Sequence, residues 1–471
     1  MPADHTGHVV DWLAVAAERR PMGTFIERDT LSWSFSWCDL RASRIAGALL
    51  ELGVRPGERV ALWGANDLES IVATFAIPRS GAVLVPLNTR LTAFEVQAQL
   101  EAADVSVILT TNEAPPFPVR LSSTIHVERL DGSAEGDSWH DPEDEFAVVF
   151  TSGTSGPPKG VRLAWRAIEA SAAGSAEHLR HSEDDRWLAV LPFYHIGGIS
   201  ILVRSARQAS TVVLPSEFGG QQLGDVLARS SIASLVPTQL VRLLNEDPQR
   251  RFPDLKAILL GGGPVPPGLV ERATERGLPV LVTYGQTEAA SQIATAPLET
   301  PGVRRARPIG GVEVRIVDDS GLELPPGNVG MIEVRGDELF SGYLHGIRRN
   351  PSDWHRTGDL GEIDWDGLLS VTDRSDRVIV SGGENVHPRE VEDALVEAGA
   401  QEACVVGLDD PEWGKVVAAA VVGSLSPEEL DGAVRGFLAG YKVPKRWLVV
   451  DELPKNSLDK VVPEEVAGLF G

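Results

Sequence analysis

Apolar and polar residues alternate with two periods along the first two thirds of the chain. Amphipathic stretches at residues 40–52 and 68–79 predict helices, because their apolar side chains recur every three or four positions. Short apolar runs between such stretches predict buried strands, at residues 59–63, 83–86, 146–150, 187–191, 211–214, 232–236, 257–260 and 280–283. Continuous apolar strands between helices predict parallel sheets in a layered α/β fold.

Beyond residue 310 the pattern changes to short strands joined by turns rich in Pro, Gly and Asn. Predicted strands at residues 312–317, 329–335, 368–371 and 377–380 indicate a small, mostly antiparallel β subdomain. An α+β unit follows, with helices predicted at 388–397 and 427–438 and strands at 403–406, 416–422 and 447–450. We predict a large N-terminal domain, residues 1–375, of layered α/β subdomains with this small β subdomain, and an α+β C-terminal domain, residues 376–471.

Length, charge and cysteine content narrow the class of protein. A chain of 471 residues exceeds what one hydrophobic core supports, so at least two domains are expected. A formal net charge of −24 argues against nucleic acids or anionic membranes as partners, because their phosphates would be repelled. Cys38 and Cys404 lack disulfide or zinc spacing, and neither a signal peptide nor a membrane span is expected. We expect a cytoplasmic enzyme, as a monomer or homodimer.

The strongest chemical pattern follows the strand predicted at residues 146–150. It reads Thr-Ser-Gly-Thr-Ser-Gly-Pro-Pro-Lys-Gly over residues 151–160. Glycines let backbone amides approach an oxyanion, hydroxyls add hydrogen bonds, and lysine adds a compact positive charge. The spacing is not that of a Walker A loop, and a plain Ser/Gly linker would not need a lysine after two prolines. The predicted phosphate loop contains Thr151, Ser152, Gly153, Thr154, Ser155, Gly156 and Lys159.

This loop resembles the [ST]SG[ST][ST]GxPKG pattern of the adenylate-forming superfamily. That superfamily comprises acyl- and aryl-CoA ligases, peptide-synthetase adenylation domains and beetle luciferases. Further matches occur in the family's order and cover most of the chain. Tyr284-Gly-Gln-Thr-Glu288 resembles the family's YGxTE motif. The resemblance places Tyr284 and Gly285 near adenine, Thr287 at the α-phosphate and Glu288 on magnesium, a metal that takes carboxylates together with substrate phosphates.

Three later motifs extend the resemblance. Arg356-Thr-Gly-Asp359 resembles the TGD motif, which implies that Asp359 holds the ribose hydroxyls, although Gly-Asp also favours a simple turn. Arg374-Ser-Asp376 resembles the motif at the domain junction, which implies that Arg374 contacts the nucleotide and that Asp376 is the hinge of a mobile C-terminal domain. Asp373 stands where the family usually has Gly.

The last motif, residues 453–460, resembles the family's PKxxxGK segment. The resemblance implies that Lys460 bridges the substrate carboxylate and the α-phosphate. Asp459 replaces the usual Gly there, which leaves open an enzyme that performs only one half-reaction.

Other segments are expected to contact the acyl group or coenzyme A. Residues 381–388 resemble the GGENxxP loop of aryl-CoA ligases, so Gly382 and Gly383 are expected to contact the pantetheine arm. His195, in Pro-Phe-Tyr-His-Ile-Gly-Gly, is expected to line the acyl pocket, with a packing role as the alternative. The HIGGIS sequence, Gly261–Gly263 and residues 287–293 are similar to o-succinylbenzoate–CoA ligases. Gly262 and Gly263 would let a flat aromatic acid lie against the backbone.

The resemblance implies an ATP-dependent, AMP-forming carboxylate–CoA ligase. It would use ATP, Mg²⁺ and coenzyme A, and would form first an acyl-adenylate and then a thioester. The small-molecule acid is expected to be aromatic and similar to o-succinylbenzoate. The alternatives are a fatty, benzoic or terpenoid acid, an enzyme limited to adenylation or thioesterification, and a non-catalytic nucleotide-binding or carrier-loading protein. Glu288, Asp359 and Lys460 argue against the non-catalytic protein.

Overall fold

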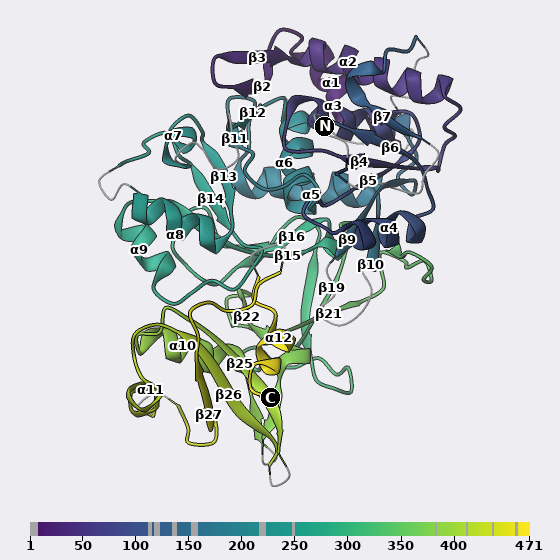
Figure 1. Cartoon of the computed structure of the whole chain (residues 1–471). Coiled ribbons are helices and arrows are strands. Elements are labelled where there is room, and N and C mark those ends of the chain that lie inside the picture. The colour runs from purple at the N-terminus through teal and green to yellow at the C-terminus, as the bar shows by residue number, and fades with distance from the viewer. Residues whose placement is uncertain are drawn as a thin grey trace. The chain divides into compact units, whose positions relative to one another are not determined.

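The computed structural model describes residues 8–111, 115–116, 123–133, 139–151, 159–215, 223–246, 250–381, 384–410, 413–435, 438–456 and 460–471. The chain separates into two compact units (Figure 1). The larger unit spans Met1–Gly262, Glu271–Glu313 and Arg335–Trp354, and the smaller unit spans Gly263–Val270, Val314–Val334 and His355–Gly471. The hinge at Asp376 and a domain boundary between residues 375 and 376 stay predictions.

The larger unit contains two mixed sheets. Among the described residues, the first has seven strands, in the order β20 (Gly342–Tyr343), β10 (Lys159–Ala164), β9 (Glu145–Thr151), β5 (Val83–Pro86), β4 (Arg59–Trp63), β6 (Val105–Thr110) and β7 (Thr124–His126). The pairs β9–β5, β5–β4 and β4–β6 are parallel. Parallel pairing of β9, β5 and β4 was predicted from their apolar runs, whereas no strand was predicted at the position of β6. Strands β9 and β10 are antiparallel, so the chain reverses direction between Thr151 and Lys159.

Within the described ranges, the second sheet has nine strands. Their order is β17 (Arg307–Pro308), β16 (Ser291–Thr295), β15 (Val280–Gln286), β14 (Ala257–Leu260), β13 (Ile232–Leu235), β11 (Arg186–Leu188), β12 (Thr211–Leu214), β2 (Thr24–Arg28) and β3 (Leu31–Ser34). The central pairs from β15 to β2 are parallel, whereas β16 returns antiparallel to β15. A separate pair joins β1 (Val9–Val10) to β8 (Trp139–His140).

Nine described α-helices lie between these strands along the chain, and they pack in more than one apolar cluster. They are α1 (Trp12–Arg19), α2 (Phe35–Glu51), α3 (Leu68–Arg79), α4 (Ala93–Ala102), α5 (Trp165–Leu179), α6 (Ile196–Gln208), α7 (Leu223–Leu227), α8 (Pro237–Glu246) and α9 (Leu269–Glu275). Side chains from α2, α3, α5 and α6 and from both sheets belong to one buried cluster, for example Phe146 and Trp187. Helix α4 contributes Val96 and Leu100 to a cluster separate from this main one. The helix predicted at 40–52 begins at Phe35, because the Ser34 hydroxyl accepts a hydrogen bond from the Trp37 amide as an N-cap.

The smaller unit contains two further sheets. Strands β18 (Glu313–Val317), β19 (Gly330–Arg335), β21 (His355–Ile363) and β22 (Leu369–Arg374) form the first, and β19, β21 and β22 pair antiparallel, as predicted. The second contains β24 (Glu384–Val386), β23 (Ile379–Ser381), β26 (Gly414–Val422), β25 (Glu402–Asp410) and β27 (Arg446–Val449). Its helices are α10 (Pro388–Glu397), α11 (Pro427–Val434) and α12 (Pro463–Gly468).

The observed elements agree with the predicted α/β class and its smaller α+β part. The strand predicted at 377–380 begins two residues later, at Ile379, and ends at Ser381, because a short 3₁₀ turn occupies Ser375–Arg377. Cys38 and Cys404 are free, buried thiols. Among the residues that the structure describes, no helix has the length and apolar character needed to cross a bilayer.

Candidate active site

The two ends of the predicted phosphate loop lie next to each other on paired strands. Thr151 ends β9, Lys159 begins β10, and the two residues are register partners. The Thr151 hydroxyl donates to the Lys159 carbonyl oxygen at 3.4 Å. The Lys159 ammonium is 5.6 Å from the centroid of the Tyr343 ring. The other predicted loop residues lie outside the described residues, namely Ser152, Gly153, Thr154, Ser155 and Gly156.

The YGxTE-like motif spans the end of β15 and a 3₁₀ turn, Thr287–Ala289. Tyr284 and Thr287 are half-buried on this segment. A Cβ atom added to Gly285 would lie 1.7 Å from the Ser291 carbonyl oxygen, so the close approach of β16 requires glycine at this position. Glu288 is half-buried, and one of its carboxylate oxygens, Oε1, accepts a hydrogen bond from the Tyr343 hydroxyl at 2.8 Å.

His195 is the residue that precedes α6. It is half-buried, and its ring lies edge-on to that of Tyr194, with 4.7 Å between centroids. The turn into the helix is held by Asn66, which donates to the Leu191 carbonyl at 2.7 Å and accepts from the Phe193 amide at 3.0 Å. A Cβ atom added to Gly198 would lie 2.2 Å from the Pro192 carbonyl oxygen, so the start of the helix that follows His195 requires glycine at this position.

A buried arginine on α6 was not predicted from sequence. Arg204 is 2% exposed, and its guanidinium carbon lies 5.7 Å from the centroid of the Trp187 ring. Within the described part of the chain, Nε and Nη2 of Arg204 have no hydrogen-bond partner. Burial lowers the pKa of Arg204 to about 9. With Ser200 and Ala290 it lines a closed gap that leaves no room for a water molecule, so Arg204 packs inside the fold rather than facing a ligand space.

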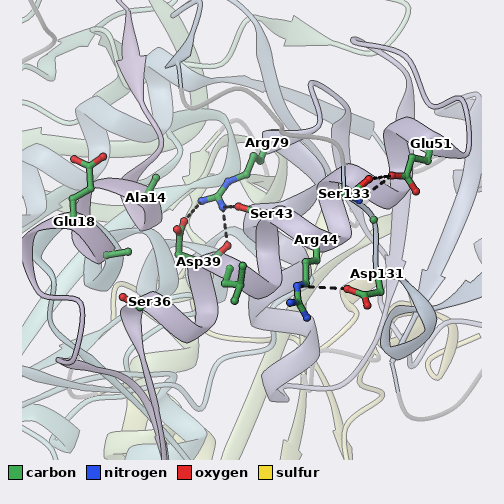
Figure 2. Close-up of a pocket in the computed structure, with 13 residues that line it drawn as sticks. Ala14, Glu18, Ser36, Asp39, Ser43, Arg44, Glu51, Arg79, Asp131 and Ser133 are labelled. Carbon is green, nitrogen blue, oxygen red and sulfur yellow. Dashed lines mark hydrogen bonds and ion pairs between the residues drawn. The ribbon is translucent and has the colours of Figure 1, made fainter.

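A larger cavity lies elsewhere in the same unit (Figure 2). Its volume is about 890 Å³, and α1, α2 and residues 131–133 provide most of its lining. Arg79 is held there by Asp11 and by Asp39, with 2.7 Å from guanidinium to carboxylate in both pairs. None of the described residues predicted for the site lines this cavity. Its ion pairs join α3 to the two preceding helices, which is a structural role.

In the smaller unit, the structure brings three predicted residues together. Asp359 on β21 is buried, and Arg374 at the end of β22 is its register partner. Arg374 donates from Nη1 to Asp359 Oδ1 at 3.2 Å, and from Nε and Nη2 to the two oxygens of Asp376, both at 3.3 Å. The predicted ribose ligand and the predicted hinge residue therefore share one guanidinium group.

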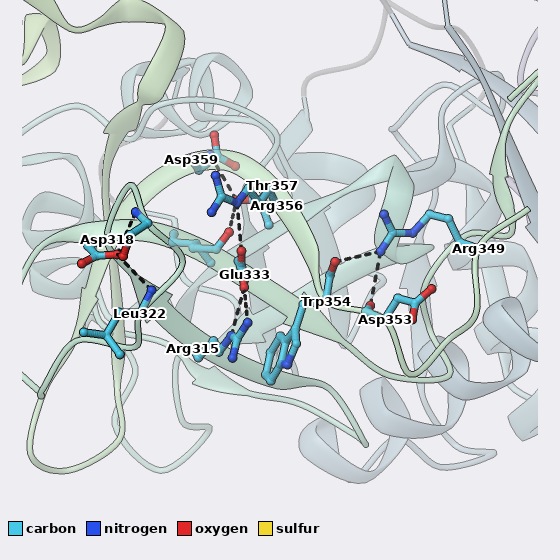
Figure 3. A network of polar contacts seen from close by, with 12 residues as sticks. Arg315, Asp318, Leu322, Glu333, Arg349, Asp353, Trp354, Arg356, Thr357 and Asp359 are labelled. Atoms are coloured by element: carbon cyan, nitrogen blue, oxygen red, sulfur yellow. Dashed lines mark hydrogen bonds and ion pairs between the residues drawn. The ribbon is translucent and has the colours of Figure 1, made fainter. Parts of the chain in front are cut away.

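The strand that carries Asp359 is anchored by a second ion network (Figure 3). Glu333, on the neighbouring strand β19, is 5% exposed. Its two carboxylate oxygens accept hydrogen bonds from Arg315 and Arg356, each with a closest distance of 2.7–2.9 Å. Arg356 is the first residue of the TGD-like motif, so this network fixes the start of the segment that presents Asp359.

Asp373, which departs from the family pattern, has a clear place in the structure. It is 7% exposed, and its Oδ2 accepts a hydrogen bond from the backbone amide of Arg389 in the first turn of α10 at 2.9 Å. Its Oδ1 accepts from the Arg374 amide at 2.7 Å. A carboxylate at a helix N-terminus satisfies an otherwise unpaired amide. The side chain thus connects β22 to α10, which a glycine could not do.

Lys460 follows residues 457–459, which lie outside the described residues; Asp459 is the last of these three. The Lys460 amide donates to Asn456 Oδ1 at 3.1 Å, and its carbonyl accepts from the Asn456 amide at 2.8 Å. Lys460 is an exposed residue, but the pKa of its ammonium group is lowered from the ordinary value. Loss of solvation is the larger cause, and the nearby Arg374 guanidinium is the second.

The predicted glycines differ in what the backbone demands of them. Gly262 has φ +76°, which disfavours any other residue. At Gly263 an added Cβ would meet nothing within 4 Å among the described atoms, so packing does not explain the absence of a side chain. Gly382 and Gly383 lie outside the described residues.

Comparison with known protein sequences gives matches over almost the whole chain. The family described as AMP-binding enzyme matches residues 13–344, and the AMP-binding enzyme C-terminal domain matches residues 390–460. The chain is similar to a 2-succinylbenzoate–CoA ligase of Bacillus cereus, with 35% identity over 475 residues that cover 98% of each chain.

Solved structures show the same similarity. The o-succinylbenzoate CoA synthetase of Bacillus subtilis, in complex with the acyl-adenylate intermediate OSB-AMP, superposes with a TM-score of 0.90 at 33% identity over 98% of each chain. The same enzyme with ATP and a magnesium ion gives 0.89 at 33% identity over 97% of this chain and 99% of that one. ATP-bound MatB of Rhodopseudomonas palustris gives 0.89 at 25% identity, over 98% of this chain and 99% of that chain.

Proposed function

The chain belongs to the family of AMP-binding enzymes, and on that premise we propose that it is an ATP-dependent, AMP-forming carboxylate–CoA ligase for o-succinylbenzoate or a similar aromatic acid. The observation that carries this proposal is the alignment to 2-succinylbenzoate–CoA ligase, which covers 98% of both chains. Such coverage includes every motif that the sequence analysis assigned to the reaction.

In the larger unit, we propose that the nucleotide phosphates are bound by the loop from Thr151 to Lys159. Tyr284 and Gly285 would then contact the adenine, and Thr287 the α-phosphate. The half-buried positions of Tyr284 and Thr287, on a strand and turn shaped by Gly285, support these roles. Lys159 and Thr287 would stabilise negative charge that develops at the phosphate during attack.

Glu288 fits the donor chemistry that magnesium requires. Magnesium is usually held by one or two carboxylates and by oxygen atoms of the substrate phosphates. Among the described residues, Glu288 Oε1 accepts a hydrogen bond from a neutral hydroxyl, that of Tyr343. We propose that Glu288 holds the ion, which when bound neutralises phosphate charge.

In the smaller unit, we propose that Asp359 binds the ribose hydroxyls, that Arg374 contacts the nucleotide, and that Lys460 bridges the acid and the α-phosphate. The substrate carboxylate attacks the α-phosphorus, the bond to pyrophosphate breaks, and acyl-AMP forms. A cation at Lys460 would offset the charge of both reacting anions. Loss of solvation and, second, the charge of Arg374 lower the pKa of Lys460, which supports a position where an anionic ligand would be bound.

For the second half-reaction, we propose that the C-terminal domain rotates about Asp376 and that Gly382 and Gly383 contact the pantetheine arm of coenzyme A. The thiolate attacks the acyl carbonyl of the adenylate, a thioester forms, and AMP leaves with the electron pair of the broken bond. His195 would line the acyl side, with Gly262 and Gly263 beside the bound ligand.

A panel of aromatic, fatty and terpenoid acids tests the proposed function. Pyrophosphate release with ATP and acid, and thioester formation on addition of CoA, are measured for each acid. We expect both products with o-succinylbenzoate. Pyrophosphate without thioester would indicate an adenylation enzyme, thioester only from synthetic acyl-AMP would indicate the second half-reaction alone, and neither product with any acid would refute the proposal.

The boundary between residues 375 and 376, a cytoplasmic location and a monomeric or homodimeric state are also proposed. They rest on the sequence alone. Limited proteolysis, cell fractionation and sedimentation analysis would test them in turn.

A further inference from the structure

Tyr343 connects Glu288 to the strand that follows the phosphate loop. It lies on β20, and its register partner is Val161 on β10, the strand that begins at Lys159. Its hydroxyl donates to Glu288 Oε1 at 2.8 Å. The Lys159 ammonium faces the same ring at 5.6 Å. One side chain therefore contacts two residues to which the proposed function gives separate roles at the phosphates.

The surrounding backbone holds Tyr343 and Glu288 in this arrangement. The Phe340 amide donates to the Glu288 carbonyl at 2.8 Å, and the Phe340 ring packs edge-on against Tyr343 with 5.0 Å between centroids. On the other side, the Leu344 amide donates to the Gly160 carbonyl at 2.8 Å. Residues 340–344 are thus fastened both to the Glu288 turn and to β10, so the hydroxyl of Tyr343 has little freedom to move away from the carboxylate.

The hydrogen bond from Tyr343 restricts Glu288 without neutralising it. An ionised carboxylate offers about four acceptor positions over two oxygens, and one hydroxyl uses one of them. A guanidinium or ammonium at the same place would cancel the charge that attracts a cation. Groups that orient a metal-binding carboxylate typically change metal affinity 10- to 100-fold when removed.

We propose that Tyr343 is a positioning residue that orients the Glu288 carboxylate toward the magnesium of bound ATP, and so sets the affinity of the ATP complex for the metal. This inference rests on the proposed function, because it takes Glu288 as the metal-binding carboxylate. It adds a role to a residue outside the YGxTE-like motif.

The test uses Tyr343→Phe, which removes the hydroxyl and keeps the ring that Lys159 and Phe340 contact. The readout is the Kd of Mn²⁺ in the complex of the full-length enzyme with α,β-methylene-ATP, measured by electron paramagnetic resonance. We expect Kd to rise about 10-fold or more, while the affinity for the nucleotide in EDTA stays unchanged. The Mg²⁺ concentration for half-maximal pyrophosphate release should rise in parallel.

Two variants separate the hydroxyl from general packing. Tyr441→Phe removes a hydroxyl from a tyrosine of the smaller unit and should leave Kd for Mn²⁺ unchanged. Phe340→Leu disturbs the packing of the Tyr343 ring and keeps its hydroxyl, so its effect on Kd should be much smaller than that of Tyr343→Phe. Equal effects of Phe340→Leu and Tyr343→Phe would overturn the inference.

Glu288→Gln distinguishes failure of this inference from failure of the proposed function. Weak Mn²⁺ binding by Glu288→Gln, with normal binding by Tyr343→Phe, would refute only the role of Tyr343. Normal binding by both variants, in an enzyme that releases no pyrophosphate with any acid, would refute the proposed function as well.

Discussion

Two carboxylates with proposed nucleotide roles have opposite surroundings. Glu288, in the larger unit, is half-buried and accepts a hydrogen bond from the neutral Tyr343 hydroxyl. Asp359, in the smaller unit, is buried and contacts the Arg374 guanidinium at 3.2 Å. The first environment preserves the negative charge of the carboxylate, whereas the second largely compensates it. A preserved charge suits a cation as ligand, and a compensated one suits neutral hydroxyl groups.

The two carboxylates also differ in how their contacts restrict movement. Glu288 is fastened by hydrogen bonds to both its side chain and its carbonyl group, through Tyr343 and Phe340. Asp359 shares Arg374 with the exposed Asp376, the proposed hinge residue. Arg374 therefore contacts both the proposed ribose ligand and the proposed hinge residue, so we expect a rotation at Asp376 to break or exchange one of these ion pairs.

The largest expected effect is that of Lys460→Ala. Loss of a cation that offsets charge at the α-phosphate should reduce pyrophosphate release by roughly 10²- to 10³-fold. Thioester formation from synthetic acyl-AMP should change little, because Lys460 is assigned to adenylation alone. Single-turnover assays of the two half-reactions measure both. Unchanged adenylation would remove Lys460 from the proposed site.

Glu288→Gln should have the next largest effect. This variant tests whether the negative charge of Glu288 is needed for metal binding. The amide keeps an oxygen that can accept the Tyr343 hydrogen bond, so only the charge is lost. We expect adenylation to fall about 10²-fold and the required Mg²⁺ concentration to rise. The Mg²⁺ dependence of pyrophosphate release provides the measurement. A loss that is independent of Mg²⁺ concentration would assign Glu288 a role other than metal binding.

Asp359→Asn should have the smallest effect of the three. An amide oxygen can still accept from a ribose hydroxyl, but the ion pair with Arg374 is lost. KM for ATP should rise about tenfold, with kcat and the Mg²⁺ dependence close to those of the unmodified enzyme. Steady-state kinetics with 2′-deoxy-ATP give a control, since the variant should discriminate less against it. If Asp359→Asn changed the Mg²⁺ dependence as Glu288→Gln does, the contrast between the two carboxylates would be wrong.

Several elements could be predicted from sequence because their information is local. The strand Arg59–Trp63 and the helices Leu68–Arg79 and Pro388–Glu397 have the predicted bounds. An apolar run defines the strand and an amphipathic stretch defines Pro388–Glu397, whereas Leu68–Arg79 is buried from Ser70 onward and begins after its N-cap, Asp67. The start of α2 was missed by five positions because Ser34 caps the helix ahead of the apolar stretch that was used to predict it.

Other features could not be predicted because they depend on residues distant in sequence. Tyr343 is 55 residues from Glu288, and only the antiparallel pairing of β20 with β10 brings it near. Arg204 lies in an apolar stretch of α6, where sequence does not reveal whether a guanidinium has a partner. Asp373 was read as a departure from a family turn, and its hydrogen bond to the Arg389 amide appears only when α10 is folded.

The sequence by itself determined which class of reaction to expect, because glycines, hydroxyls, carboxylates and lysines at fixed spacings are properties of short segments. It also determined the α/β class, through the periods of its apolar residues. Only the tertiary structure decided how each carboxylate is held: Glu288 by a hydroxyl and Asp359 by a guanidinium. Charge compensation acts over a few ångströms in space, and strand pairing between distant segments sets those distances.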